Sequence, residues 1–166
     1  QLILAVAPDH AGPASRVWPA HLPRLPQGPG DLGDRMARLL RRQPPGPACI
    51  IGGDIPGVQR HHIARAFAAL GRNDAVFGPA PDGGYWLIGL KGVCPPPPGF
   101  LRGVRWSTRH ALTDSQATLP GARIALADTL HDPLADEAPW GDALHGLHEH
   151  LVAADARLAL ADRLLV

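Results

Sequence analysis

Short apolar runs alternate with amphipathic segments along this chain of 166 residues, and this alternation is the feature that most constrains its fold. The apolar runs that predict strands are residues 2–7, 48–51, 75–77, 85–90 and 123–127. The segments with helical spacing of apolar residues are 31–42, 63–70 and 108–119, the last with Ser107 as its expected N-cap. Strands that alternate with helices are typical of parallel βαβ units, so the sequence predicts an α/β sandwich.

The composition indicates a soluble protein with one domain over residues 1–166. Hydrophobic residues make up 45% of the chain, and no apolar run approaches the length of a membrane span. The formal net charge is +1, which gives no electrostatic reason to expect nucleic acid or a membrane surface as a partner. Cys49 lies in an apolar run and Cys94 precedes four prolines. These dissimilar settings predict no disulfide framework and favour a cytoplasmic location.

The two ends of the chain give separate expectations. The sequence opens directly on the strand-like run 2–7, which predicts that the first βα unit of the domain is missing. Toward the other end, leucines recur every seven residues and predict an apolar stripe along a helical extension over residues 135–166. The leucines of this stripe are Leu144, Leu151, Leu158 and Leu165. Packing of the stripe against the domain's own sheet is the favoured interpretation, and a homodimer formed through the helix is the alternative.

A glycine-rich turn follows the apolar run 48–51, and it contains Gly52, Gly53 and Asp54. In open α/β sheets, ligands bind at the carboxyl ends of the strands. A carboxylate at that place suits a hard cation that bridges phosphate groups. The alternative is that Asp54 caps a helix that begins near Pro56.

A second turn contains Asp82, Gly83 and Gly84, followed by the aromatic residues Tyr85 and Trp86. Asp-Gly is a frequent turn pair, so a plain hairpin is the structural interpretation. Two glycines beside two aromatic rings also make a place where a sugar ring can lie against the backbone. Asp82 is then a candidate general base that accepts a proton from an acceptor hydroxyl.

Two further segments carry candidate binding residues. Residues 19–30 are rich in proline and glycine and are expected to be irregular, and Gln27 and Gly28 within them are candidates to contact a base or a sugar edge. Asp31 follows at the start of a helix and is more readily an N-cap. Asp128 follows the strand expected over 123–127 and is a candidate second carboxylate for a divalent metal shared with Asp54, or a helix cap.

Four segments occur in an order that resembles a known family. They are residues 27–36, 50–57, 78–90 and 106–108, of which the stretch from Asp82 to Leu90 is the most specific. Together they resemble a bacterial family of uncharacterised type A glycosyltransferases, some of which are assigned to arsenosugar biosynthesis. That family is similar to the guanylyltransferases that act on 2-phospho-lactate and on molybdopterin.

The resemblance implies a Rossmann-like three-layer sandwich of the nucleotide-diphospho-sugar transferase kind, with Mg²⁺ or Mn²⁺ as cofactor. In this resemblance Asp54 matches the metal-binding aspartate, Asp128 matches the second aspartate of an Asp-x-Asp-Thr element, and residues 82–86 match the acceptor side. Three departures stand out. Leu126 replaces the first aspartate of that element, Gly53 replaces a small hydroxyl residue, and no Lys-Thr-Arg phosphate loop is present.

These observations predict a metal-dependent enzyme that transfers a glycosyl group from a nucleotide-diphospho-sugar to a small acceptor. Asp82 is the candidate catalytic residue, and Asp54 and Asp128 are the candidate metal ligands. The candidate nucleotide- and substrate-binding residues are Gln27, Gly28, Asp31, Gly52, Gly53, Gly83, Gly84, Tyr85 and Trp106. The alternatives are a guanylyltransferase-like nucleotidyltransferase acting on a small phosphorylated molecule, and a truncated non-catalytic domain that acts through assembly.

Overall fold

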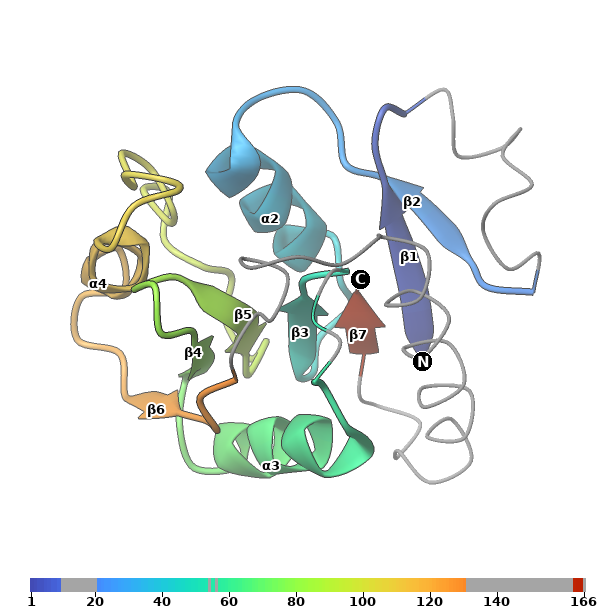
Figure 1. The fold of residues 1–166 in the computed structure, drawn as a ribbon. Coiled ribbons are helices and arrows are strands. Elements are labelled where there is room, and N and C mark those ends of the chain that lie inside the picture. Colours follow the sequence, from blue (N-terminus) through green and yellow to red (C-terminus); the bar gives the residue numbers. More distant parts are fainter. Residues whose placement is uncertain (10–20, 54, 56, 131–162, 166) are drawn as a thin grey trace.

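One mixed sheet of seven strands organises the part of the chain that the structure describes (Figure 1). The structure is a computed structural model and describes residues 1–9, 21–53, 55, 57–130 and 163–165. The strands are β1 (Leu2–Val6), β2 (Arg24–Pro26), β3 (Ala48–Ile51), β4 (Ala75–Pro79), β5 (Tyr85–Leu90), β6 (Ile124–Leu126) and β7 (Arg163–Leu165). Their order across the sheet is β2-β1-β7-β3-β5-β4-β6.

Helices cover both faces of this sheet. Helices α2 (Leu32–Arg41) and α4 (Ala111–Ala117) lie on one face, and α3 (Arg60–Leu70) lies on the other (Figure 1). Each face has its own hydrophobic core, with Met36, Leu39, Phe77 and Ile88 in the first and Ile63, Phe67, Val76 and Leu87 in the second. The three-layer α/β sandwich predicted from the sequence is therefore confirmed.

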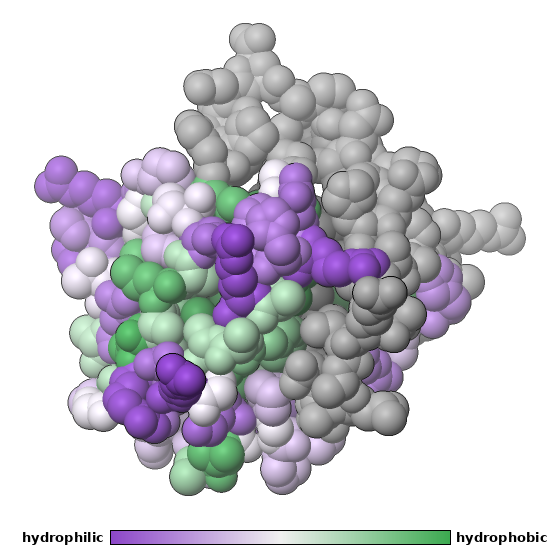
Figure 2. Space-filling view, turned by 90° about the horizontal axis from the view of Figure 1, so that it is seen from below, coloured by the Kyte–Doolittle hydropathy of each residue, from purple (hydrophilic) through white to green (hydrophobic). Residues whose placement is uncertain are grey.

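The face covered by α3 shows hydrophilic residues projecting among hydrophobic ones (Figure 2). Helix α3 buries Ile63, Ala66, Phe67 and Leu70 against the sheet, and its other residues make up part of this surface. Among the described residues, no helix combines the length and the apolar character that crossing a membrane would require.

Helix α2 shows how local sequence decides where a helix begins. Asp31 is its N-cap, and the Asp31 Oδ1 accepts the backbone N–H of Asp34 at 2.8 Å. The Asp34 carboxylate in turn accepts the Asp31 N–H at 3.4 Å, which completes a capping box. Met36, Leu39 and Leu40 form the buried side of the helix. The helix predicted over 31–42, and the N-cap interpretation of Asp31, are confirmed.

Strand β5 departs from the parallel arrangement that the sequence predicts. It pairs antiparallel with β3 on one side and with β4 on the other. The connection between β4 and β5 is a short turn at residues 80–84, and a turn of this length joins only antiparallel strands. The hairpin interpretation of the Asp82-Gly83 pair is therefore the one that the structure bears out.

Two local predictions are wrong. Residues 24–26 were expected to be irregular, but they form β2, which pairs in parallel with β1. Helix α4 begins at Ala111 rather than near residue 108, and its N-cap is His110. Ser107 does not cap the helix, because the helix begins four residues later at Ala111 and the φ of Ser107 is +56°.

The helix predicted over residues 135–166 does not extend through Leu165. Arg163–Leu165 form β7, which pairs in parallel with both β1 and β3. Pairing with two neighbouring strands takes up the backbone groups that a helix would have bonded within itself. Leu144, Leu151 and Leu158 lie outside the described residues, so the rest of that predicted helix and the homodimer through it stay predictions.

Candidate functional site

The predicted site residues gather at one edge of the sheet. The described strands other than β5 all run parallel to one another, so their carboxyl ends lie at the same edge. Gln27 follows β2, Gly52 follows β3, the Asp82 turn follows β4 and Asp128 comes after β6. In open α/β sheets this edge is where ligands bind. We define these strand ends as the carboxyl edge.

The turn after β3 is anchored to the start of β5. The backbone N–H of Gly52 donates to the carbonyl oxygen of Trp86 at 3.0 Å. Gly53 follows in the same turn, and both glycines are only partly buried. Asp54 and Pro56 lie outside the described residues, so the placement of the predicted metal ligand Asp54 stays a prediction.

The turn after β4 presents Asp82 to solvent and holds it in a defined shape. Ala80 N–H donates to the Gly84 carbonyl at 3.0 Å, and Gly83 N–H donates to the Ala80 carbonyl at 3.1 Å. The Asp82 Oδ1 accepts the Gly84 N–H at 2.8 Å. Within the described residues the Asp82 Oδ2 makes no hydrogen bond, which leaves one carboxylate oxygen available at the carboxyl edge.

Gly83 is the residue that lets this turn pack against the segment before α4. Its φ is +86°, and a Cβ atom added to it would overlap the backbone of Arg109. The Gly83 carbonyl also accepts the N–H of Leu112 at 3.0 Å. The Asp82 turn therefore rests directly on residues 109–112.

Replacing Gly83 with alanine is expected to lower the free energy of unfolding by about 2 kcal/mol, because both the positive φ and the Arg109 backbone oppose a side chain. The matched control is Gly103→Ala, where φ is +70° but no atom lies within 4 Å of the added Cβ. The control is expected to lose only about 1 kcal/mol. Urea denaturation followed by circular dichroism measures both, and equal losses would show that the Arg109 contact does not matter.

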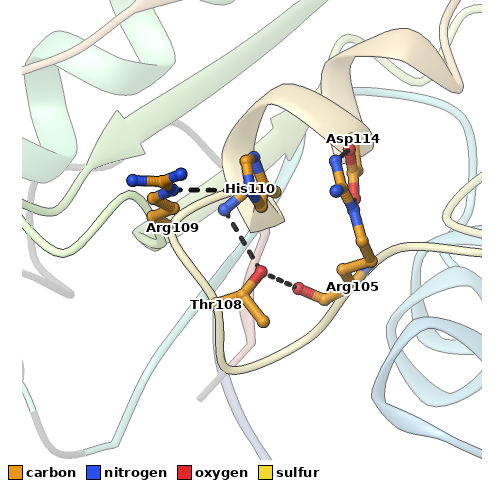
Figure 3. Close-up of polar contacts among 5 residues, drawn as sticks. All are labelled: Arg105, Thr108, Arg109, His110 and Asp114. Carbon is orange, nitrogen blue, oxygen red and sulfur yellow. Dashed lines mark hydrogen bonds and ion pairs between the residues drawn. The ribbon is translucent and has the colours of Figure 1, made fainter.

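An ion pair joins the segment before α4 to the helix itself (Figure 3). Arg105 donates from Nε to Asp114 Oδ2 and from Nη2 to Asp114 Oδ1, both at 2.8 Å. The Asp114 Oδ2 also accepts the Arg105 backbone N–H at 3.1 Å. These hydrogen bonds from the Arg105 side chain, and next from its backbone, hold the pKa of Asp114 well below its ordinary value.

Thr108 completes the shape of the same segment. Its Oγ1 donates to the Arg105 carbonyl at 2.7 Å and accepts the His110 backbone N–H at 3.2 Å (Figure 3). Arg109 and His110 are thereby held beside the Asp82 turn, and Arg109 Nε lies 3.5 Å from His110 Nε2. Within the described residues Arg109 forms no ion pair.

The sequence alone does not single out Arg109 and His110, which the structure places beside the Asp82 turn. The signal was close by, because the neighbouring stretch 106–108 belongs to the segments that resemble the glycosyltransferase family. Gly83 and Arg109 are far apart in the sequence and come into contact only when the β4–β5 turn packs against the segment before α4.

Tyr85 and Trp106 lie in the packed layer beneath the carboxyl edge. The Tyr85 hydroxyl forms a hydrogen bond of 3.1 Å with Oγ of Ser115, a fully buried residue of α4. The Tyr85 ring meets Phe77 edge-on at 5.2 Å and Trp106 at 6.5 Å between ring centroids. Trp106 packs against Gly33 of α2, and its buried Nε1 has no hydrogen-bond partner within the described residues. Both side chains therefore pack against the hydrophobic core on the α2 and α4 side of the sheet.

The burial of Tyr85 gives a titration that can be measured directly. Burial raises the pKa of Tyr85 from 10.0 to about 12, against the smaller opposing effect of the Ser115 hydrogen bond. Tyr85 is the only tyrosine in the chain. Tyrosinate absorbance of the folded protein is therefore expected to rise with a midpoint about two pH units above that of the denatured chain.

The same shift predicts how stability depends on pH. Because the folded pKa lies above the unfolded one, the stabilisation is complete below pH 10 and is lost as the pH rises through 12. The loss amounts to about 3 kcal/mol. Tyr85→Phe should be free of this loss between pH 10 and 12, as measured by urea denaturation. A tyrosinate midpoint near the denatured value would contradict the buried position of the ring.

Gln27 and Gly28 are bonded within the protein at the far side of the sheet, and Asp31 caps α2. Gln27 Nε2 donates to the Ala5 carbonyl at 2.8 Å, and the Gly28 N–H donates to Asp9 Oδ1 at 2.9 Å. Strand β2 lies five positions from β4, which corresponds to roughly 24 Å. The structure therefore separates Gln27, which follows β2, from the Asp82 turn.

Asp128 lies at the opposite side of the carboxyl edge, and its carboxylate forms an ion pair with Arg65. Arg65 Nη1 of α3 lies 3.1 Å from both carboxylate oxygens of Asp128. The Asp128 carbonyl accepts the Trp86 Nε1–H at 2.9 Å, and the Trp86 carbonyl accepts the N–H of Gly52 in the turn that leads to Asp54. A guanidinium beside a carboxylate opposes a second cation there. Because Asp54 lies outside the described residues, a metal site shared by Asp54 and Asp128 stays a prediction.

No group of three or more His, Cys, Asp or Glu side chains suited to a metal ion occurs among the residues that the structure describes. The expectation of Mg²⁺ or Mn²⁺ therefore depends on Asp54, which lies outside them.

Comparison with known proteins adds the family. The sequence profile of a group described as "Uncharacterized protein conserved in bacteria (DUF2064)" matches residues 1–108. The chain belongs to the DUF2064 family. The matched part of this DUF2064 protein includes both glycine-rich turns of the carboxyl edge and ends within the segment before α4. No curated protein matches it.

The fold of this DUF2064 protein is also that of a solved structure. A crystal structure of a protein from Desulfovibrio desulfuricans G20, named a "putative nucleotide-diphospho-sugar transferase", superposes with a TM-score of 0.64. The match covers 97% of this chain and 76% of the other, with 22% sequence identity. At this identity the likeness establishes a shared fold.

Proposed function

We propose that this DUF2064 protein transfers a glycosyl group from a nucleotide-diphospho-sugar to a small acceptor. The observation that carries the proposal is the meeting of two glycine-rich turns, Gly52-Gly53 and Asp82–Gly84, at either side of the start of β5. The first turn offers backbone without side chains, against which a diphosphate can lie. The second offers a carboxylate oxygen, on Asp82, that no group of the described chain occupies.

The proposed reaction assigns Asp82 the role of general base. The acceptor hydroxyl oxygen forms a bond to the anomeric carbon, the bond from that carbon to the diphosphate breaks, and the nucleoside diphosphate departs. The hydroxyl proton passes to Asp82 Oδ2, while Oδ1 keeps the turn in shape through Gly84. A divalent metal, if held by Asp54, would offset the charge of the departing diphosphate.

One observation favours a second candidate, nucleotidyl transfer to a small phosphorylated acceptor. Arg109 lies beside the Asp82 turn and forms no ion pair within the described residues. An unpaired guanidinium at an acceptor site suits an anionic group such as a phosphate. In this reaction an acceptor phosphate oxygen attacks the α-phosphorus of a nucleoside triphosphate, and pyrophosphate departs.

Product analysis separates the two reactions. The full chain is incubated with nucleotide sugars or nucleoside triphosphates, a panel of neutral and phosphorylated sugars, and Mg²⁺ or Mn²⁺, and the products are identified by mass spectrometry. Release of nucleoside diphosphate supports glycosyl transfer, and release of pyrophosphate supports nucleotidyl transfer. If neither appears and calorimetry detects no nucleotide binding, the enzyme proposal is overturned in favour of a non-catalytic domain that acts through assembly.

The metal assignment has its own test. Asp54→Asn is expected to raise the Mg²⁺ concentration needed for half-maximal activity at least about tenfold, because the ligand loses its charge. Asp74→Asn is the matched control and should leave the metal requirement unchanged, since Asp74 lies at the start of β4 and pairs with Arg123. Equal metal requirements for Asp54→Asn and the unaltered chain would remove Asp54 as a ligand.

A further inference from the structure

The ion pair between Arg65 and Asp128 differs in geometry from the other two ion pairs among the described residues. Arg105 and Arg123 each bond to their aspartate through two nitrogen atoms, Nε and Nη2. Arg65 uses one nitrogen atom, and its Nη1 lies 3.1 Å from both carboxylate oxygens of Asp128. Within the described residues, the Nε and Nη2 groups of Arg65 make no hydrogen bond. These are the two groups with which an arginine side chain binds a phosphate in a paired fashion.

Trp86 connects this ion pair to the turn after β3. Its indole Nε1 donates to the backbone carbonyl of Asp128 at 2.9 Å. Its own carbonyl accepts the N–H of Gly52 at 3.0 Å. The ion pair and the glycine-rich turn are therefore joined through one residue at the carboxyl edge. The Arg65 side chain is 65% exposed there, so a ligand at this edge can reach the guanidinium from solvent.

The first half of α3 is basic. Arg60 and Arg65 are positively charged, and the first turn of the helix contains no acidic residue. Burial and the charge of His61 lower the pKa of His62, Asp128 opposes this change, and Arg65 adds to it. Among the described residues, Asp128 is thus the only carboxylate with a resolved effect on this histidine. An excess of positive charge at a ligand-binding edge attracts an anionic ligand.

We propose that Arg65 binds the diphosphate group of the nucleotide substrate. The inference rests on the proposed function, from which it takes the nucleotide. Nη1 stays bonded to Asp128, while Nε and Nη2 donate to two oxygens of the diphosphate. The backbone of Gly52 and Gly53 lies against the same group. The charge of the diphosphate is then offset in part by a side chain of α3.

Calorimetry of nucleotide binding tests the role of Arg65. The full chain is titrated with ADP, GDP, UDP, CDP and dTDP in the presence of Mg²⁺, and the diphosphate that binds most tightly serves as the probe. Arg65→Gln is expected to bind this probe at least about tenfold more weakly, because hydrogen bonds to a charged group are lost. Arg65→Lys should lose less affinity, since lysine keeps the charge but cannot form the paired contact.

The matched control is Arg123→Gln. Arg123 also pairs with an aspartate, Asp74, and its side chain is 66% exposed, but it precedes β6 and so lies at the opposite edge of the sheet. This variant should bind the probe as tightly as the unaltered chain. Both variants should keep the urea midpoint of the unaltered chain, because exposed ion pairs contribute little to stability. Equal affinities of Arg65→Gln and Arg123→Gln would overturn the proposal.

The direction of the change separates this proposal from a metal ion bound to Asp128. If Asp128 binds the metal, removal of Arg65 frees its carboxylate from a competing cation. Arg65→Gln would then bind the probe with Mg²⁺ more tightly than the unaltered chain does. Tighter binding would therefore overturn the role of Arg65 and assign Asp128 to the metal.

Failure of this inference and failure of the proposed function give different results. If the unaltered chain binds none of the five diphosphates, the proposed function is overturned and the role of Arg65 with it. If the unaltered chain binds a probe and Arg65→Gln binds it equally well, only the role of Arg65 is overturned.

Discussion

Replacing Asp82 with asparagine is expected to lower kcat by about 10²–10⁴-fold and to leave the stability of the fold nearly unchanged. Asparagine keeps an oxygen that can accept the Gly84 N–H, so the turn retains the bond of 2.8 Å. What is lost is the carboxylate that accepts the proton of the acceptor hydroxyl. The measurement is the steady-state rate in the proposed transfer reaction, together with urea denaturation of both proteins.

The control for this experiment is Asp82→Ala, which loses both the base and the bond to Gly84. It should match Asp82→Asn in kcat and be less stable by about 1 kcal/mol. Full activity of Asp82→Asn would show that the turn has a structural role and that another group takes the proton.

Truncation of Trp86 to alanine is expected to lower the free energy of unfolding by about 3–5 kcal/mol. Trp86 is 2% exposed and sits in the core on the α3 side of the sheet. Its Nε1 donates to the backbone carbonyl of Asp128 at 2.9 Å, so the side chain ties the start of β5 to the segment after β6. Gly78 on β4 leaves the space that the indole fills. Urea denaturation monitored by circular dichroism measures the loss.

Trp86→Phe separates the contributions of packing and of the hydrogen bond. The ring still fills most of the space, but the Asp128 carbonyl loses its donor, so the expected loss is about 1–2 kcal/mol. A loss for Trp86→Ala no larger than this would mean that the core closes over the missing indole.

The elements that the sequence predicts well are those whose own residues decide them. Helix α2 carries its capping box in Asp31 and Asp34 and its buried stripe in Met36, Leu39 and Leu40, so local pattern and structure agree. Strands β3 and β5 are apolar runs long enough to be recognised without knowledge of their neighbours.

The elements that were missed depend on contacts from elsewhere in the chain. The described parts of β2 and β7 have three residues each. They are strands because their backbones pair with those of β1 and β3, respectively. Likewise the left-handed backbone of Ser107 belongs to a segment shaped by Arg105, Thr108 and Asp114. The spacing of apolar residues along the sequence carries no information about such contacts.

The candidate site, too, was predictable from the sequence only in part. Its position was predictable, since turns after strands of an α/β sheet share one edge. The partners of individual side chains were not. The pairing of Asp128 with Arg65 joins residues 63 positions apart, and the contact of Gly83 with Arg109 requires the packing of two loops.

The outer margins of the sheet have a consequence for how the protein behaves at high concentration. Both marginal strands, β2 and β6, are only three residues long, and β2 includes Pro26, which has no N–H to offer. Short edge strands of this kind disfavour edge-to-edge pairing between the sheets of two molecules. Pairing of one molecule's sheet with another's is therefore not expected to be the route by which concentrated samples of this protein aggregate.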